Sequence, residues 1–274
     1  MEFGVGLPIS APERLTEWAR AAEAYGFGSV ALLDRLVFDN PEPLTALAVL
    51  AGATRTIRLQ TEVLLGPLRQ TALLAKQVAT LDRMSGGRFV LGIGVGGRED
   101  DHAAAGTPIE RRGRALDEQL VALREIWGGS SIGPRPGRID ILIGGFAPAA
   151  LRRVALHADG FICAAPLEWA GGLVRTVQEQ WAEAGREGRP RLVCQINVAV
   201  GPPATVERAT RAVADYYAFT GRAGWGAPLS DPGRIAGTVA AYREFGADEL
   251  VLYCYGDDPG QVGRLAAILD CEGR

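Results

Sequence analysis

The sequence predicts a single-domain α/β protein whose eight parallel strands alternate with helices and close into a (β/α)8 barrel, the TIM-barrel architecture. Short apolar runs alternate with amphipathic segments from one end of the chain to the other. The runs are apolar throughout, which is typical of strands buried on both faces in a parallel sheet covered by helices. The length of 274 residues suits one such barrel. We therefore expect residues 1–274 to form one domain.

The strands are predicted from apolar runs that turn residues interrupt. In chain order they are residues 3–7, 29–33, 57–65, 88–95, 140–143, 159–163, 192–200 and 249–254. An open, doubly wound sheet is the competing architecture. Its first strand would carry a glycine-rich dinucleotide fingerprint, but Gly4-Val5-Gly6-Leu7-Pro8 lacks the third glycine and contains a proline.

The helices are predicted from apolar residues at helical spacing and from cap residues. Leu15, Trp18 and Ala22 mark the first helix, and Asn40 and Pro41 are in the preferred cap and first-turn positions of the second. Later apolar faces cover residues 73–81 and 116–126, and further helices are expected to begin near Pro148, Glu168, Ala204, Asp231 and Pro259.

Composition narrows the classes of function. The chain is 47% hydrophobic and 22% charged, with a formal net charge of −3 and no basic patch, so we expect no nucleic-acid partner. No apolar run approaches the ~20 residues that span a bilayer, and the N-terminus lacks signal-peptide features, so we expect no membrane association and a cytoplasmic location. The cysteines Cys163, Cys194, Cys254 and Cys271 lack metal or redox spacing, and we expect no metal site.

In a barrel of this type, reactive groups lie after the carboxyl ends of the strands. Gly144 and Gly145, between a strand and a helix, could direct backbone N–H groups at a phosphate, or could form only a tight turn. Asp34 and Arg35 could orient a polar heterocycle or simply pair with each other. His102 is expected to be solvated, in an acidic loop with Glu99, Asp100 and Asp101.

The residue inventory also excludes some chemistries. The only lysine, Lys76, lies on a predicted helix away from every strand end, which excludes a Schiff-base aldolase. No Gly-x-Ser-x-Gly motif is present. With so few reactive groups of its own, the chain is expected to borrow a cofactor.

A series of motifs along most of the chain resembles the luciferase-like monooxygenase superfamily. In order they are EPLTAL (42–47), TIRLQT (56–61), PLR (67–69), LAKQ (74–77), LDRMSGGR (81–88), GIGVG (92–96), RGRALDE (112–118), IGG (143–145), ADGF (158–161) and GADE (246–249). The resemblance implies a flavin- or deazaflavin-dependent oxidoreductase or monooxygenase that binds FMN or coenzyme F420 and acts on a small organic substrate by hydride transfer or oxygen activation. It also implies a homodimer as the usual assembly.

By the same resemblance, individual residues acquire expected roles. Asp34 and Arg35 would be catalytic, with Asp34 near the cofactor ring. Val63, Leu64 and Leu65 would support the ring face, where many relatives have a non-proline cis peptide bond. Gly94 and Gly96 would also bind the cofactor, and Gly144, Gly145 and Phe146 would hold its phosphate. Phe38, Arg98, Phe146, Trp169 and the stretch 216–225 are expected to line the substrate pocket.

Three departures from the family pattern bear on activity. Arg35 replaces a histidine common in relatives, Gly97 replaces a tryptophan, and the segment between Trp127 and Ile141 is short. Arg35 would stabilise a reduced anionic flavin but would be a poor acid or base. Two alternatives therefore stay open: a degenerate flavin-binding barrel without turnover, and a flavin-free phosphate-binding lyase or isomerase that would depend on Glu62 or Asp34. The resemblance also favours F420 over FMN, because members of the family that are rich in Arg and poor in Lys, like this chain, often use F420.

Overall fold

The strands form where the apolar runs end up buried on both faces. The computed structural model describes residues 1–8, 11–222, 224 and 226–270, so Cys271 lies outside the described residues. The strands are β1 (Glu2–Gly6), β2 (Ser29–Leu32), β3 (Arg58–Thr61), β4 (Leu64–Leu65), β5 (Phe89–Gly94), β6 (Asp140–Gly144), β7 (Gly160–Cys163), β8 (Arg191–Val198) and β9 (Glu249–Cys254).

The strands close into a parallel barrel, as predicted. The sheet order is β3-β2-β1-β9-β8-β7-β6-β5-β4, and an additional pairing of β3 with β5 closes the ring. β3 and β4 are two parts of one barrel strand, separated by a non-proline cis peptide bond between Glu62 and Val63. The barrel therefore has eight strand positions, which confirms the predicted fold class.

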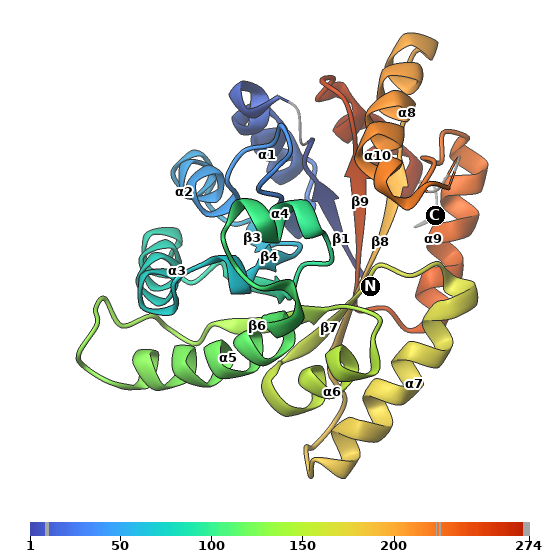
Figure 1. Ribbon diagram of the computed structural model, residues 1–274. Helices are drawn as coiled ribbons and strands as arrows, with labels where there is room; N and C mark the ends of the chain where they lie inside the picture. Colours follow the sequence, from blue (N-terminus) through green and yellow to red (C-terminus); the bar gives the residue numbers. More distant parts are fainter. Residues whose placement is uncertain (9–10, 223, 225, 271–274) are drawn as a thin grey trace.

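Helices surround the barrel on its outside (Figure 1). They are α1 (Leu15–Ala24), α2 (Pro43–Ala53), α3 (Thr71–Ser85), α4 (Glu99–Ala104), α5 (Arg112–Gly128), α6 (Pro148–His157), α7 (Leu167–Glu183), α8 (Pro203–Tyr217), α9 (Pro232–Phe245) and α10 (Gly260–Asp270). Within the described part of the chain, none of them combines the length and the apolar character needed to cross a bilayer.

Two helix predictions were wrong. The second helix begins at Pro43, not at Pro41, because Glu42 is its N-cap and its side chain accepts a hydrogen bond from the Thr45 amide at 2.7 Å. The acidic segment expected as a loop forms helix α4, whose first turn holds three carboxylates. Acidic residues near a helix N-terminus are stabilised by the helix dipole, and this signal could have predicted α4.

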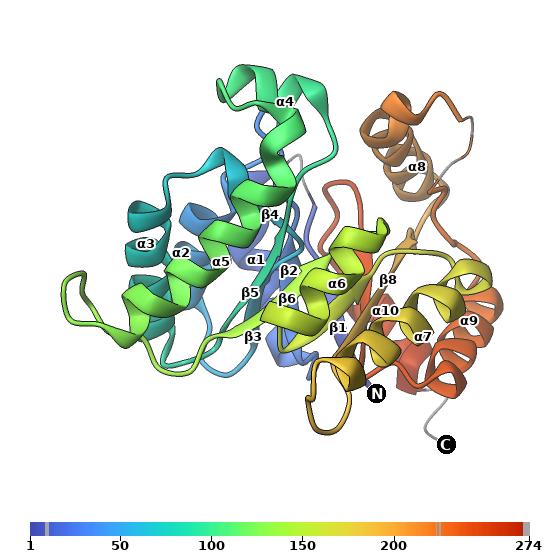
Figure 2. The same cartoon turned by 60° about the horizontal axis from the view of Figure 1, so that its bottom comes forward.

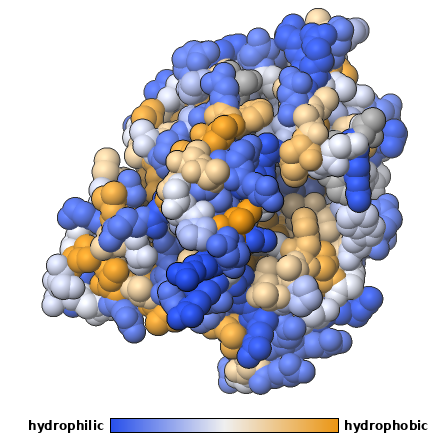
Figure 3. Space-filling view, in the orientation of Figure 1, coloured by the Kyte–Doolittle hydropathy of each residue, from blue (hydrophilic) through white to orange (hydrophobic). Residues whose placement is uncertain are grey.

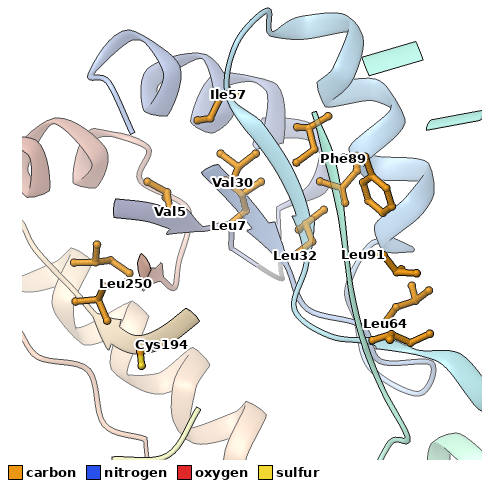
Figure 4. Close-up of a cluster of buried hydrophobic side chains, with 14 of the residues drawn as sticks. Val5, Leu7, Val30, Leu32, Ile57, Leu64, Phe89, Leu91, Cys194 and Leu250 are labelled. Atoms are coloured by element: carbon orange, nitrogen blue, oxygen red, sulfur yellow. The ribbon is translucent and has the colours of Figure 1, made fainter. Parts of the chain in front are cut away.

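Apolar packing forms two layers. The larger one lies between the strands and the helices, and Figure 4 shows part of it, including Val30, Leu64 and Leu91. The smaller one fills the barrel interior and includes Val90, Leu142, Ile162, Val193 and Val251. The cysteines of β7, β8 and β9 are buried and free, as expected of small apolar side chains.

An ion-pair network closes the amino-terminal end of the barrel. Glu249 is fully buried; it receives Arg191 at 2.6 Å, lies 3.7 Å from Arg58, and also accepts a hydrogen bond from Ser29. The opposite end of the barrel carries α4 and α8, which stand at the top of Figure 2, away from the N-terminus. The carboxyl ends of the strands open between them.

Candidate functional site

A cavity of about 400 Å³ occupies the carboxyl end of the barrel. Its walls come from the ends of β2, β3, β5, β6, β7 and β8 and from α8. The lining residues are Leu33, Asp34, Arg35, Glu62, Val63, Leu65, Gly94, Val95, Gly96, Gly97, Arg98, Asp101, Gly144, Gly145, Phe146, Ile162, Ala164, Gln195, Tyr216, Tyr217 and Phe219. In the space-filling view, hydrophobic and hydrophilic side chains both border the hollow near the middle of this face (Figure 3).

Val63 projects into the cavity from the interrupted strand. Its methyl groups occupy space left by two glycines, since an added Cβ would lie 2.8 Å from Val63 Cγ2 at Gly94 and 2.9 Å from Val63 Cγ1 at Gly144. Leu65 also lines the cavity, whereas Leu64 is buried in the layer between strands and helices (Figure 4). The expected cis bond is present. Of the three predicted supports for the ring, Val63 and Leu65 line the cavity and Leu64 does not, and their contact with a ring stays a prediction.

Backbone donors converge where β6 meets α6. Gly145 has a φ of +147°, which favours glycine, and no side chain caps the helix at Ala147. Within the described residues, the amides of Gly145, Phe146 and Ala147 donate to no protein acceptor. Phe146 lines the cavity, and 55% of its surface is exposed. The arrangement can receive an anion at the positive end of the α6 dipole.

Asp34 is buried in the cavity wall, but its carboxylate is already occupied. Oδ2 accepts hydrogen bonds from the Leu65 amide at 2.8 Å and from Arg69 Nη1 at 2.6 Å, and Oδ1 accepts from Arg69 Nη2 at 3.2 Å. Arg69 also reaches Glu42 at 3.1 Å. Asp34 thus fixes the backbone beyond the cis bond, and its contact with a cofactor stays a prediction.

Arg35 pairs with α4 and not with Asp34, so the suggested Asp34–Arg35 pair does not form. Arg35 Nε donates to Asp101 at 2.5 Å, and Nη2 donates to Asp100 at 3.3 Å. The second oxygen of Asp101 accepts from the amides of Leu36 at 2.9 Å and Val37 at 2.8 Å. Arg35 Nη1 is buried and has no hydrogen-bond partner in the described part of the chain. It is an unsatisfied donor on a residue of the cavity wall.

The rim of the cavity is built partly from residues that the sequence had identified. Arg98 lies over the Phe219 ring at 4.3 Å and joins the start of α4 to the segment after α8. Its pairing with Asp100 lowers the pKa of that carboxyl to about 2.

Tyr216 and Tyr217 also line the cavity, and residues 223 and 225 of the expected stretch lie outside the described residues. Phe38 and Trp169 do not line it; Phe38 instead packs against Tyr216, with ring centroids 5.6 Å apart.

His102 is buried, so its expected solvation is wrong. Nε2 lies 3.1 Å from the Val95 carbonyl oxygen, and Nδ1 lies 3.0 Å from Thr107 Oγ1. With both nitrogens engaged, His102 holds the loop after β5 against α4. Gly96 leaves room for this ring, since an added Cβ would lie 3.2 Å from Nε2. Among the described residues, no group of three or more His, Cys, Asp or Glu could hold a metal ion.

Glu62 is the titratable group at the base of the cavity. Only 3% of its surface is exposed, and burial together with the charge of Glu249 raises the pKa of its carboxyl to about 8. From the sequence, Glu62 was a candidate, with Asp34, only for the acid–base chemistry of a flavin-free lyase or isomerase. The sequence signal that could have identified Glu62 is an acidic residue immediately after an apolar strand, where strand ends form the barrel mouth.

A second cavity of about 540 Å³ adjoins the first between α7 and α9. The two share Ala164, Gln195 and Tyr217 in their walls. Glu168, Asn197 and Arg234 make the second cavity more polar. The carboxyl face therefore offers one mainly apolar space over the barrel axis and one polar space beside it.

Comparison with known proteins places this chain in a family. A family model described as luciferase-like monooxygenase matches residues 1–251. An uncharacterized protein of Mycobacterium tuberculosis is 32% identical over 183 residues, which cover 61% of this chain and 65% of that protein. An F420-dependent glucose-6-phosphate dehydrogenase of Nakamurella multipartita is 31% identical over 202 residues, covering 64% of this chain and 60% of that enzyme. The matches thus span less than two thirds of either relative.

The fold is shared over the whole chain. The crystal structure of a monooxygenase from Streptomyces bottropensis matches with a TM-score of 0.85, covering 99% of this chain and 98% of that one at 19% identity. The match of the family model over residues 1–251, on a barrel of this topology, identifies the family. The chain belongs to the luciferase-like monooxygenase family.

Proposed function

We propose that this protein is a deazaflavin-dependent oxidoreductase that binds coenzyme F420 in the cavity at the barrel mouth and acts on a small organic substrate. FMN is the second cofactor that the same site suits. Bound there, either group would supply two-electron redox chemistry, by hydride transfer or by oxygen activation. The F420-dependent relative from Nakamurella multipartita favours the deazaflavin.

The observation that carries the proposal is the set of unpaired donors around one apolar cavity. The amides of Gly145, Phe146 and Ala147 are free at the α6 N-terminus, and Arg35 Nη1 is buried without a partner in the described part of the chain. A phosphate at the first position would accept hydrogen bonds from these amides at the positive end of the α6 dipole. A polar ring edge at the second would satisfy Arg35 Nη1, because buried donors rarely lack acceptors. Apolar contacts from Val63 and Leu65 suit the face of a planar ring.

The chain's own residues would position and polarise the bound group. Asp34 holds the Leu65 segment, and Asp101 holds the Arg35 segment, so both walls are fixed before any ligand arrives. Arg35 stays charged and would stabilise negative charge that develops on the ring. Such preorganised charge costs no reorganisation during the reaction.

Removal of one phosphate donor tests the proposal. Ala147 has φ −72° and ψ 148°, close to the values of the prolines that begin α7 and α8, Pro166 (−55°, 151°) and Pro202 (−55°, 154°). Ala147→Pro should therefore fold while losing only an amide hydrogen. Ala147→Gly retains that hydrogen and is the matched control.

The proposal predicts that Ala147→Pro binds the cofactor about 10- to 100-fold more weakly, as expected for loss of a hydrogen bond to a charged group worth roughly 1.5–3 kcal/mol. Ala147→Gly should bind within about threefold of the wild type. Equal affinity of the proline variant and the wild type for both F420 and FMN would show that no cofactor phosphate binds at this position.

A further inference from the structure

Glu62 places a carboxyl group inside the barrel directly beneath the cavity. It follows β3, and its side chain lies on the same interior side as Gln60, two residues earlier. Gln60 Nε2 donates to Glu62 Oε1 at 3.0 Å. The other oxygen, Oε2, is buried and has no hydrogen-bond partner among the described residues. One oxygen is thus held by the protein, and the other is free to serve a ligand.

Tyr253 of β9 faces Glu62 across the barrel interior. Its ring is 1% exposed and fills space that Gly6 leaves open, since a Cβ at Gly6 would lie 2.3 Å from the ring. The Tyr253 hydroxyl lies close enough to Glu62 to lower the pKa of its carboxyl, and within the described chain neither this hydroxyl nor Glu62 Oε2 has a hydrogen-bond partner of good geometry. Three buried polar atoms, Gln60 Oε1, Glu62 Oε2 and the Tyr253 hydroxyl oxygen, are therefore unsatisfied below the cavity among the described residues.

Burial and the nearby charge of Glu249 favour the neutral form of the Glu62 carboxyl. Burial contributes most to raising its pKa to about 8, and the carboxylate of Glu249 adds to the rise. Gln60 and Tyr253 lower the pKa by smaller amounts, and none of the groups that shift it is a cation. Arg191 and Arg58 pair with Glu249 at the far end of the barrel. Gln60 donates to Oε1, and within the described chain no donor reaches Oε2.

Other charges at the cavity are engaged elsewhere. Asp34 is paired with Arg69, and Arg35 is paired with Asp101. Both carboxylates are held by arginine side chains, which do not deprotonate. Within the described cavity lining, Glu62 is the one carboxyl whose pKa is raised toward neutrality. A general acid works best with a pKa near the working pH.

We propose that Glu62 is the internal acid of this site, a carboxyl group whose Oε2 donates a proton to the oxygen or nitrogen atom of the ligand that gains an electron pair. This inference rests on the proposed function, because the electron pair comes from a reduced flavin-class cofactor. The Oε2–H bond breaks, its electrons stay on the carboxylate, and the new bond forms at the acceptor atom. A proton from water then restores the acid. In the reverse direction the carboxylate accepts the proton.

The first test needs no cofactor. Infrared difference spectra of the wild type against Glu62→Gln should show the carbonyl band of a protonated carboxylic acid at pH 7, and the band should disappear with a midpoint near pH 8. Glu125→Gln, an exposed glutamate on α5, is the matched control and should leave this band unchanged. An ionised Glu62 at pH 6 to 7 would overturn the inference.

The second test measures turnover of the cofactor-loaded enzyme. Glu62→Gln should lower kcat by about 10²- to 10⁴-fold and remove the pH dependence near 8, while cofactor affinity changes only a few-fold. If this variant does not fold, Glu62→Asp retains a carboxyl one methylene farther from the cavity, and its kcat should also fall. Undiminished turnover with an unchanged pH profile would overturn this inference alone. Failure of the wild type to bind either cofactor would overturn the proposed function, and this inference with it.

Discussion

The carboxylate of Asp34 receives the guanidinium of Arg69 through both of its oxygens, at 2.6 and 3.2 Å. The same carboxylate accepts the Leu65 amide at 2.8 Å. Asp34 lies after β2 and Arg69 after β4, so the pair ties the ends of two barrel strands together across the cavity wall. Its charge is neutralised within the protein, which gives Asp34 a positioning role.

Replacement of Asp34 should therefore cost stability. Asp34→Asn leaves the Arg69 guanidinium without its main buried partner, and we expect a loss of about 2–3 kcal/mol in the free energy of unfolding, measured by urea denaturation. This is below the 3–5 kcal/mol of a fully buried pair because the Arg69 side chain is 18% exposed. Glu118→Gln, which removes the exposed pair with Arg114, should change stability by less than about 0.5 kcal/mol. Equal stability of Asp34→Asn and the wild type would contradict this role.

Arg35 should act through the several N–H donors of its guanidinium group as well as through its charge. Arg35→Lys keeps the charge but loses the free Nη1 donor and the geometry that reaches Asp101. We expect cofactor affinity to fall about tenfold, consistent with one lost hydrogen bond. Arg208→Lys, which alters an exposed pair with Asp257, is the control and should bind normally. Wild-type affinity in Arg35→Lys would exclude a contact between Nη1 and the cofactor.

Glu62 should make the stability of the wild type depend on pH. Its pKa in the folded protein is about 8, raised from an ordinary value of 4.5. Between these values the unfolded chain binds fewer protons than the native protein, so stability falls as pH rises through this window and levels off above about 8. The full loss is on the order of 5 kcal/mol.

Subtraction of the Glu62→Gln curve isolates this effect, since the other titrating groups are common to both proteins. Urea unfolding of both proteins from pH 4 to 9 is the measurement. As pH rises, the unfolding free energy of the wild type should fall relative to that of Glu62→Gln. A difference that does not vary with pH would show that the folded and unfolded pKa values of Glu62 are equal.

Gly144 should be intolerant of a side chain because Val63 occupies the space. Gly144→Ala would bring a Cβ to 2.9 Å from Val63 Cγ1, and we expect a loss of about 1–3 kcal/mol from overpacking, together with weaker cofactor binding. Gly52→Ala is a matched control in helix α2, where the added Cβ meets nothing within 4 Å. It should stabilise the protein by about 0.5–1 kcal/mol. Comparison of the two by thermal and urea unfolding checks the prediction.

The barrel could be predicted because apolar runs in the sequence mark the strands that are buried in the folded protein. All eight predicted strand positions are present, and only 57–65 is divided, by the cis bond. The second helix was placed too early because Asn40 and Pro41 resemble a cap, while the Glu42 side chain makes the actual cap contact. Cap chemistry is local, and two adjacent candidates cannot be separated without the backbone geometry.

The backbone positions of the site could be predicted from the sequence, but the partners in its ion pairs could not. Gly144 and Gly145 lie where strand-end rules place them. The partners of Asp34 and Arg35 were missed, because Arg69 and Asp101 are 35 and 66 residues distant along the chain. The raised pKa of Glu62 was also missed, since it depends on burial and on the carboxylate of Glu249, which is brought close only by closure of the barrel.

The central claim is that the mouth cavity holds a flavin-type cofactor. The most direct measurement is a titration of the purified wild-type protein with F420 and with FMN, side by side, followed by absorption and fluorescence. We predict saturable binding, tighter for F420, that Ala147→Pro weakens and Ala147→Gly does not. Binding of neither cofactor, under conditions where another member of the family binds its own, would contradict the account and leave the flavin-free phosphate-binding barrel in its place.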